Sequence, residues 1–134
     1  MSAAVLSRGA LTAVLVSTAL VAPTPTAWAA RGVLVSLYAR TPVTTLVAEA
    51  HFSPYGLPKN FSVCDLWHHD KAPTIGELTL VGQRKITLTA PNMAKGQKGS
   101  CKLITLTVKS GTTVNVLLCT NHGRLCKETR GGVA

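Results

Sequence analysis

The stretch from Cys101 to Cys126 constrains the fold most, because it combines strand-like alternation with three of the four cysteines of the chain. Apolar and polar side chains alternate in both of its halves, at residues 104–109 and 113–118. Period-two alternation in segments rich in β-branched residues is typical of half-buried strands. Gly111, between the halves, supplies the positive φ that a short connection requires. The sequence therefore predicts two strands joined as a hairpin around residues 110–112.

The faces of these two strands predict their register. Opposed residues of an antiparallel ladder point to the same side of the sheet. Val108 is therefore expected opposite Val114, and Leu106 opposite Val116, with the apolar faces of both strands toward the core.

The same register bears on the disulfides. Cys101 and Cys119 would be diagonal neighbours about 7–8 Å apart, which exceeds the upper limit of about 6.8 Å for the Cα atoms of a disulfide. Four cysteines allow three pairings. We predict the pairing Cys64–Cys101 and Cys119–Cys126, in which the second disulfide closes a short loop.

The first 29 residues have the features of a secretory signal peptide. Arg8 gives a positive n-region, residues 10–22 form an apolar run, and Ala27-Trp28-Ala29 fits the small-x-small cleavage rule. That run is too short to span a bilayer well, although an uncleaved membrane anchor is the alternative. Cleavage after Ala29 would leave one secreted domain at residues 30–134, with a frayed polar tail at 128–134. Disulfides fit this oxidising, extracellular compartment.

The predicted mature chain is basic. Removing Arg8 leaves 13 of the 14 lysines and arginines against 5 acidic residues, a formal net charge of +8. Such a charge attracts a secreted domain to anionic cell-wall polymers, membranes, nucleic acid or acidic proteins. Solubility alone also accounts for a charge of this size.

Further alternating segments predict additional strands at residues 33–39, 43–52, 61–67, 77–81 and 85–90. The last two form a second hairpin, in which Leu78 is expected opposite Leu88 and Leu80 opposite Ile86. Segments rich in proline and glycine separate the strands. About seven short strands with turn signals between them predict an all-β domain, a small β-sandwich, with a small β-barrel as the alternative.

The cysteine framework also carries a resemblance. The chain has Val63-Cys64-Asp65, a lone Cys101, and a hydrophobic strand that ends in Cys119 before a short loop to Cys126. This pattern resembles a group of small secreted actinobacterial β-proteins over residues 64–126, and it implies a fold and a compartment but no activity. That group has Asp-Gly where this chain has 68–70, His-His-Asp. The size, the signal and residues 36–39 are also similar to the Streptomyces subtilisin-inhibitor family, whose Cys-rich reactive segment is absent here.

The predicted Cys119–Cys126 loop is the first candidate binding site. It displays His122, Arg124 and Leu125, and a disulfide-closed basic loop could act as the bait of a protease inhibitor. The alternative is that the disulfide only stabilises the fold and that the arginine is solvated. The Pro-rich segment 53–60, with Lys59, is a second candidate bait.

Lysines form the second candidate site. Lys95, Lys98 and Lys102 predict a basic stripe that Lys85 and Lys109 could extend, and such a stripe could bind phosphates or cell-wall anions. Single-stranded nucleic acid is a poorer match, because no aromatic residues lie between these lysines. A solvated basic loop is the alternative.

The segment Trp67-His68-His69-Asp70 could supply metal ligands together with His51 and His122, since neutral imidazole binds zinc or copper. However, adjacent residues on a strand point to opposite faces. Their spacing therefore favours a polar surface turn, and we predict no metal and no cofactor.

The sequence as a whole predicts a secreted, disulfide-stabilised binding module that acts on an extracellular anionic surface or protein partner. The alternative is an inhibitor of a trypsin- or subtilisin-like protease. We expect no enzyme activity, because the chain lacks a Gly-x-Ser-x-Gly elbow and its cysteines are expected to be oxidised. We also expect no specific nucleic-acid partner and no membrane span after signal removal.

Overall fold

The computed structural model describes residues 29–40, 43–55 and 58–134, so the predicted signal peptide lies outside the described residues except for Ala29. The described residues form eight strands: β1 (Val33–Arg40), β2 (Thr44–Ser53), β3 (Lys59–Asp65), β4 (Thr74–Leu80), β5 (Arg84–Ala90), β6 (Ser100–Leu106), β7 (Thr113–Thr120) and β8 (Leu125–Val133). They contain no helix, and hence none that could cross a membrane.

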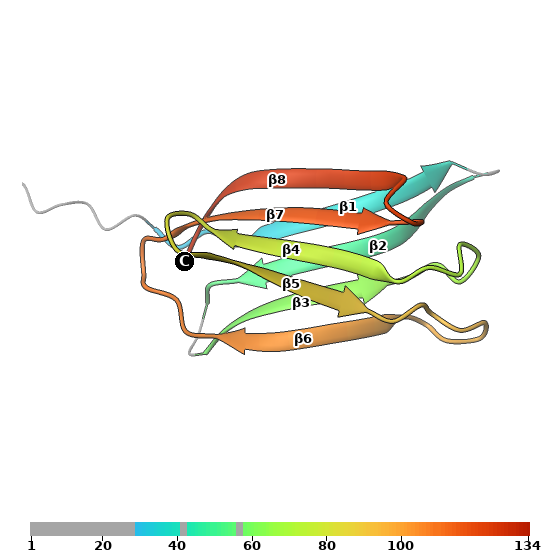
Figure 1. The fold of residues 1–134 in the computed structure, drawn as a ribbon, viewed down its shortest axis with the longest axis horizontal. Coiled ribbons are helices and arrows are strands. Elements are labelled where there is room, and N and C mark those ends of the chain that lie inside the picture. Colours follow the sequence, from blue (N-terminus) through green and yellow to red (C-terminus); the bar gives the residue numbers. More distant parts are fainter. Residues whose placement is uncertain (1–28, 41–42, 56–57) are drawn as a thin grey trace, which may run out of the picture.

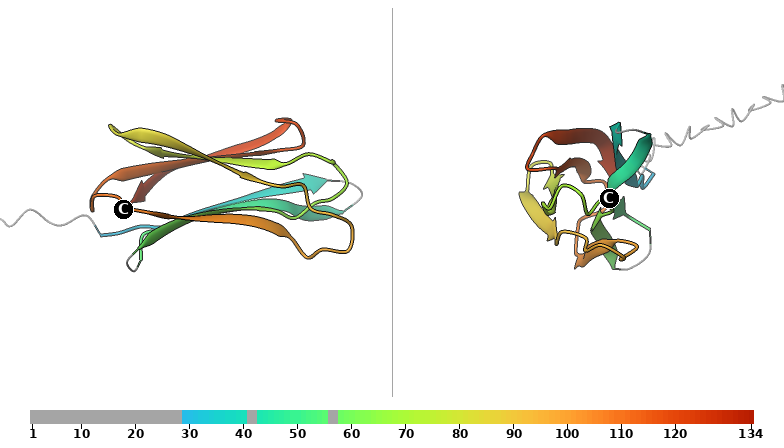
Figure 2. Two further views of the ribbon diagram at one scale, coloured as in Figure 1. Left: turned by 60° about the horizontal axis from the view of Figure 1, so that its bottom comes forward. Right: turned by 90° about the vertical axis from the view of Figure 1, so that its right-hand side faces the viewer.

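Two antiparallel sheets, ordered β1-β2-β3-β6 and β5-β4-β7-β8, pack face to face (Figure 1). The left view of Figure 2 shows these two layers with the core between them. Neither sheet closes into a barrel. The predicted β-sandwich is therefore confirmed, and the barrel alternative is wrong.

The core follows the predicted alternation. Inward-pointing residues of the strands are buried and their neighbours are more exposed, as in β7, where every second side chain from Val114 to Thr120 is buried. Burial of these apolar side chains contributes about 25 cal/mol per Å² of surface removed from water. The largest fully buried apolar side chains are Phe52, Phe61, Leu78, Leu80, Leu118, Val35, Val47, Val63, Val114 and Val116.

The predicted hairpin of residues 101–119 is wrong, although its strands and their inward faces are correct. β6 pairs with β3 in one sheet, whereas β7 pairs with β4 and β8 in the other. The connection at 107–112 crosses from sheet to sheet, and Gly111 in it has the expected positive φ of 86°. The error arose because alternation defines which face of a strand is buried but not which strand is its neighbour.

The second hairpin forms, but its register differs by two residues. β4 pairs with β5 so that Leu78 lies opposite Ile86 and Leu80 opposite Arg84. A shift of two residues keeps every side chain on its predicted face, because the side-chain period of a strand is two. The three-residue connection is therefore Val81-Gly82-Gln83.

Both predicted disulfides are confirmed. Cys64 and Cys101 lie directly opposite each other on β3 and β6, with Cα atoms 4.1 Å apart. Cys119 and Cys126 lie opposite each other on β7 and β8, with Cα atoms 4.2 Å apart. Each disulfide joins two neighbouring strands on the outer face of one sheet, and neither crosses the core.

The segment predicted as a frayed tail is ordered. Residues 128–133 belong to β8, and Val133 and Ala134 are buried. The amide of Ala134 donates to the Thr112 carbonyl, and Arg31 and Val133 exchange two backbone hydrogen bonds. These contacts join β8 to the segment before β1, so the two sheets meet at one corner. The polar sequence of this segment reflects an edge strand rather than disorder.

The connections gather at the two ends of the sandwich (Figure 1). One end, called the loop end here, carries segments 66–73, 91–99 and 121–124. The opposite end, called the crossover end, carries segments 81–83 and 107–112. The right view of Figure 2 faces the loop end.

Candidate functional site

Asp65 connects two segments of the loop end. Its Oδ1 accepts a hydrogen bond of 3.0 Å from the Trp67 amide, and its Oδ2 accepts one of 3.1 Å from the Met93 amide. The side chain is fully buried. The carboxylate is held by backbone N–H groups instead of a cation, which satisfies both of its oxygens. Asp65 thereby fixes segment 91–99 beside the start of segment 66–73.

Asp70 connects the third segment in the same way. Its Oδ1 accepts from the Ala72 amide at 3.1 Å, and its Oδ2 accepts from the Asn121 amide at 3.0 Å and from Thr120 Oγ1 at 3.1 Å. Both aspartates thus form an Asx turn with the amide two residues on, and use the other oxygen to hold a distant segment. Segment 66–73 is therefore fastened to both of its neighbours.

The turn between β7 and β8 has an unusual backbone. Asn121, His122 and Gly123 have positive φ values of 51°, 55° and 78°. Glycine adopts this region freely, whereas asparagine and histidine adopt it at a cost on the order of 1 kcal/mol or more. The turn is held at its base by the Cys119–Cys126 disulfide and at its side by Asp70. Surrounding structure thus enforces one conformation of these four residues.

The loop end is rich in exposed cations. Lys71, Lys95, Lys98 and Arg124 are all exposed there, against a single acidic residue, Asp70, in the same three segments. Within the described ranges the ion pairs are Lys85 with Glu77 and Arg130 with Glu128, and none involves a cation of the loop end. The aspartates of this end are occupied by N–H and O–H donors, so they do not pair with the lysines.

Trp67, His68 and His69 form an aromatic cluster within segment 66–73. Trp67 packs its half-buried ring on the core, its centroid lies 6.1 Å from that of His69, and the two imidazoles lie 3.9 Å apart. His122 lies in the neighbouring turn, whereas His51 lies on the outer face of β2. Across the described residues no three His, Cys, Asp or Glu side chains gather closely enough to hold a metal ion.

The predicted binding residues are only partly brought together. His122, Arg124, Lys95 and Lys98 all lie at the loop end. Leu125 differs from the prediction, because it is half-buried as the first residue of β8 and packs against the core. Arg124 lies in a tight turn, in which its amide donates to the Asn121 carbonyl at 3.1 Å, so the disulfide-closed loop is compact rather than extended.

The lysines of the predicted stripe lie in several elements. Lys102 is exposed on the edge strand β6, four residues after Lys98. Lys85 pairs with Glu77 on β5 and β4. Lys109 lies at the crossover end. Lys95 and Lys98 are therefore the part of the stripe that belongs to the loop end.

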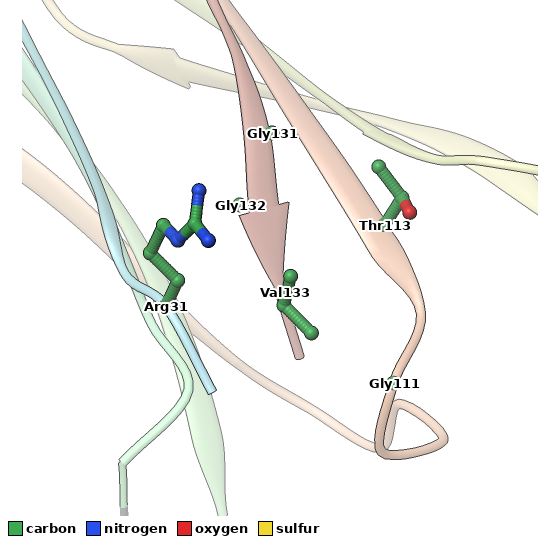
Figure 3. Close-up of a pocket in the computed structure, with 6 residues that line it drawn as sticks. All are labelled: Arg31, Gly111, Thr113, Gly131, Gly132 and Val133. Atoms are coloured by element: carbon green, nitrogen blue, oxygen red, sulfur yellow. The ribbon is translucent and has the colours of Figure 1, made fainter. Parts of the chain in front are cut away.

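Two cavities lie among the described residues of the crossover end. The larger, of about 430 Å³, is lined by Arg31, Thr113, Val133 and three glycines (Figure 3). Several of its backbone N–H groups are already used, since Gly111 donates to Ala134, and Gly131 donates to Asn115. The smaller, of about 270 Å³, is lined by residues that include Lys59. Lys59 is buried, so the sequence prediction that it lies in an exposed bait segment is wrong.

Sequence reasoning missed the roles of Asp65 and Asp70. Each acid precedes an Asx turn, and aspartate followed by a non-repetitive segment is a signal for such turns. Their second oxygens, however, accept from Met93 and Asn121, which are 28 and 51 residues away in sequence. No local pattern predicts contacts of that range.

Comparison of the chain with protein-family models, with curated proteins and with solved structures finds no match.

Replacing Asp70 should loosen the turn of residues 121–124. Asp70→Ala removes the acceptor of three hydrogen bonds, and the free energy of unfolding is expected to fall by about 2 kcal/mol, because hydrogen bonds to charged groups contribute about 1.5–3 kcal/mol. Denaturant unfolding measures this loss, and amide hydrogen exchange at Asn121 should become faster. Glu49→Ala is a suitable control, since Glu49 accepts only a 3.3 Å bond from Ser36. Equal losses of unfolding free energy in both variants would contradict the role of Asp70 in holding the turn of residues 121–124.

Asp65 should give the stability of the protein a recognisable dependence on pH. Burial raises the pKa of its carboxyl above the ordinary value of 3.8, against the opposing effect of the Trp67 and Met93 N–H donors, and the charge of Asp70 adds a small increase. A raised pKa in the folded state contributes stability below pH 3.8, and that contribution is lost as pH rises through the folded pKa.

The variant Asp65→Asn has no titrating group at this position. Comparing it with the wild-type chain therefore isolates the contribution of the Asp65 carboxyl to the pH dependence of stability. The free energy of unfolding of the wild-type chain minus that of the variant should decrease as pH rises through this window, when both are measured by urea unfolding. A difference that increases with pH would mean that hydrogen bonding outweighs desolvation at Asp65.

Proposed function

We propose that the chain is a secreted, disulfide-stabilised binding module whose loop end engages an anionic surface or acidic protein partner outside the cell. The observation that carries this proposal is the unpaired positive charge of that end. Lys71, Lys95, Lys98 and Arg124 are exposed and form no ion pair within the described ranges. Positive potential of this kind raises the encounter rate with anionic partners.

The order of the loop end supports binding through it. Asp65 and Asp70 hold its three segments together by three long-range hydrogen bonds, and two further bonds close local turns. A surface that is ordered before it meets its partner loses less conformational entropy on binding. Loops on a rigid scaffold are also the usual position of binding residues. We therefore propose that this protein acts by binding rather than by catalysis.

The extracellular location rests on the disulfides and on the signal-like first 29 residues. Disulfides are typical of oxidising compartments and are rare in the cytosol. Both pairs of cysteines in this chain are bonded, and the chain has no other cysteines. The apolar run and the cleavage motif ending at Ala29 support export by the secretory route.

Inhibition of a trypsin- or subtilisin-like protease is a weaker second proposal. Arg124 is exposed and lies inside a disulfide-closed turn, which supports it. Three positive φ values precede Arg124, and the following Leu125 pairs with Thr120 and packs inward. A protease cleft binds an extended segment, and the turn of residues 121–124 cannot adopt an extended conformation while Thr120 and Leu125 stay paired.

Charge reversal at the loop end should weaken binding to anionic membranes. Lys95→Glu with Lys98→Glu is expected to reduce affinity for phosphatidylglycerol vesicles at least tenfold at low salt, because each basic side chain near such a surface contributes about 1 kcal/mol. Vesicle co-sedimentation measures the affinity. Binding of the wild-type chain should also weaken as salt is added, since salt screens exposed charges.

A second double variant separates position from net charge. Arg84→Glu with Lys109→Glu changes the formal charge equally, but both residues are exposed at the crossover end. This variant should retain most of the wild-type affinity. Equal losses in the two double variants would mean that net charge alone drives binding, and unchanged binding in the first would refute the role of the loop end.

The chain should not inhibit trypsin tightly. Titration of trypsin with purified protein is expected to leave activity on a small chromogenic substrate unchanged at equimolar concentrations, because the backbone around Arg124 is not extended. Stoichiometric inhibition that Arg124→Ala abolishes would favour the second proposal over the first.

A further inference from the structure

Lys59 is the one buried lysine among the described residues. It lies at the start of β3, and only 7% of its surface is exposed. Its Nζ donates a hydrogen bond of 3.0 Å to the Val108 carbonyl and one of 3.4 Å to Ser110 Oγ. An ammonium group has three N–H donors, so one donor is left over after these two contacts.

The positive charge of Lys59 has no acidic partner. All five acidic residues of the chain lie within the described ranges, and each is engaged elsewhere. Asp65 and Asp70 hold the loop end, Glu77 and Glu128 pair with Lys85 and Arg130, and Glu49 accepts from Ser36. A buried cation without a counter-charge is costly, so this position favours an added negative charge.

A cavity of about 270 Å³ lies beside this lysine. Besides Lys59, its lining has the aliphatic residues Pro58, Leu106 and Val108 and the hydroxyl residues Thr107 and Ser110. Leu106 and Val108 are nearly buried, whereas Thr107 and Ser110 are exposed. The cavity thus combines an apolar wall, a single buried cation and a polar opening, which is the usual composition of a small-ligand site.

We propose that this cavity binds an organic monocarboxylate with a short aliphatic chain. The carboxylate would accept the free N–H of Lys59 in a charge-assisted hydrogen bond. The aliphatic chain would lie against Pro58, Leu106 and Val108, where each methylene that leaves water contributes about 0.8 kcal/mol. An inorganic oxyanion is a poorer match, since it has no apolar part and this wall offers it few donors.

The site is independent of the loop end. The start of β3, which carries Lys59, and the 107–112 connection lie at the crossover end, opposite segments 91–99 and 121–124 (Figure 1). Binding at one site can therefore be measured without reference to the other.

Hexanoate is a suitable probe for the full chain. Titration followed by amide chemical shifts should give saturable changes at Val108 and Ser110 and none at Asn121. Lys59→Met keeps an unbranched apolar side chain but removes the ammonium group, and it should reduce hexanoate affinity at least tenfold. Lys127→Met, at an exposed lysine of β8 that belongs to neither proposed site, should bind hexanoate as the wild-type chain does. Hexan-1-ol and inorganic phosphate should each bind at least tenfold more weakly than hexanoate.

Three results would overturn the proposal. Equal hexanoate affinity in Lys59→Met and the wild-type chain would assign Lys59 a structural role, as a donor to the Val108 carbonyl. Phosphate binding as tight as hexanoate binding would contradict the apolar part of the site. Hexanoate-induced shifts at Asn121 in place of Val108 would move the carboxylate to the loop end. The shifts of the wild-type chain alone remain decisive if Lys59→Met does not fold.

Discussion

Two buried or half-buried carboxylates, Asp65 and Asp70, determine how one end of this sandwich is arranged. Each uses one oxygen to close a turn within its own segment and the other to hold a segment from a different part of the chain. Backbone N–H groups that would otherwise be unsatisfied at the ends of strands thereby find acceptors. The three loop-end segments consequently form one ordered surface on two sheets that share no ladder there.

This use of the acids has an electrostatic consequence. The chain has 14 basic and 5 acidic residues, and at the loop end both carboxylates are occupied by N–H and O–H donors. The lysines and Arg124 of that end therefore form no ion pair with these carboxylates and stay exposed to solvent. The same shortage of acids leaves Lys59 without a counter-charge at the crossover end. One compositional bias thus underlies both proposed sites, one on an exposed surface and one in a cavity that opens to solvent.

Much of the fold could be predicted from the sequence, because alternation and cysteine spacing are local or nearly local signals. The inward faces of the strands are correct, since a half-buried strand must alternate. Both disulfides are also correct, although the argument against Cys101–Cys119 assumed a hairpin that does not form. The partner of β6 could not be predicted, because Leu106 and Val108 would be equally well buried in either sheet. Polarity misled the prediction for residues 128–134, where an exposed edge strand has the composition of a tail. At the candidate site the residue types were visible, but the contacts of Asp70 with Asn121 and of Lys59 with Val108 bridge about 50 residues.

The positions of the disulfides also bear on how this sandwich could fail. β6 and β8 are edge strands of the two sheets, and each is bonded covalently to its inner neighbour, β3 or β7. An edge strand that peels away exposes unpaired backbone and can be exchanged with another copy of the chain. Oxidation closes that route on one edge of each sheet, so the crosslinks guard against domain swapping as well as against unfolding.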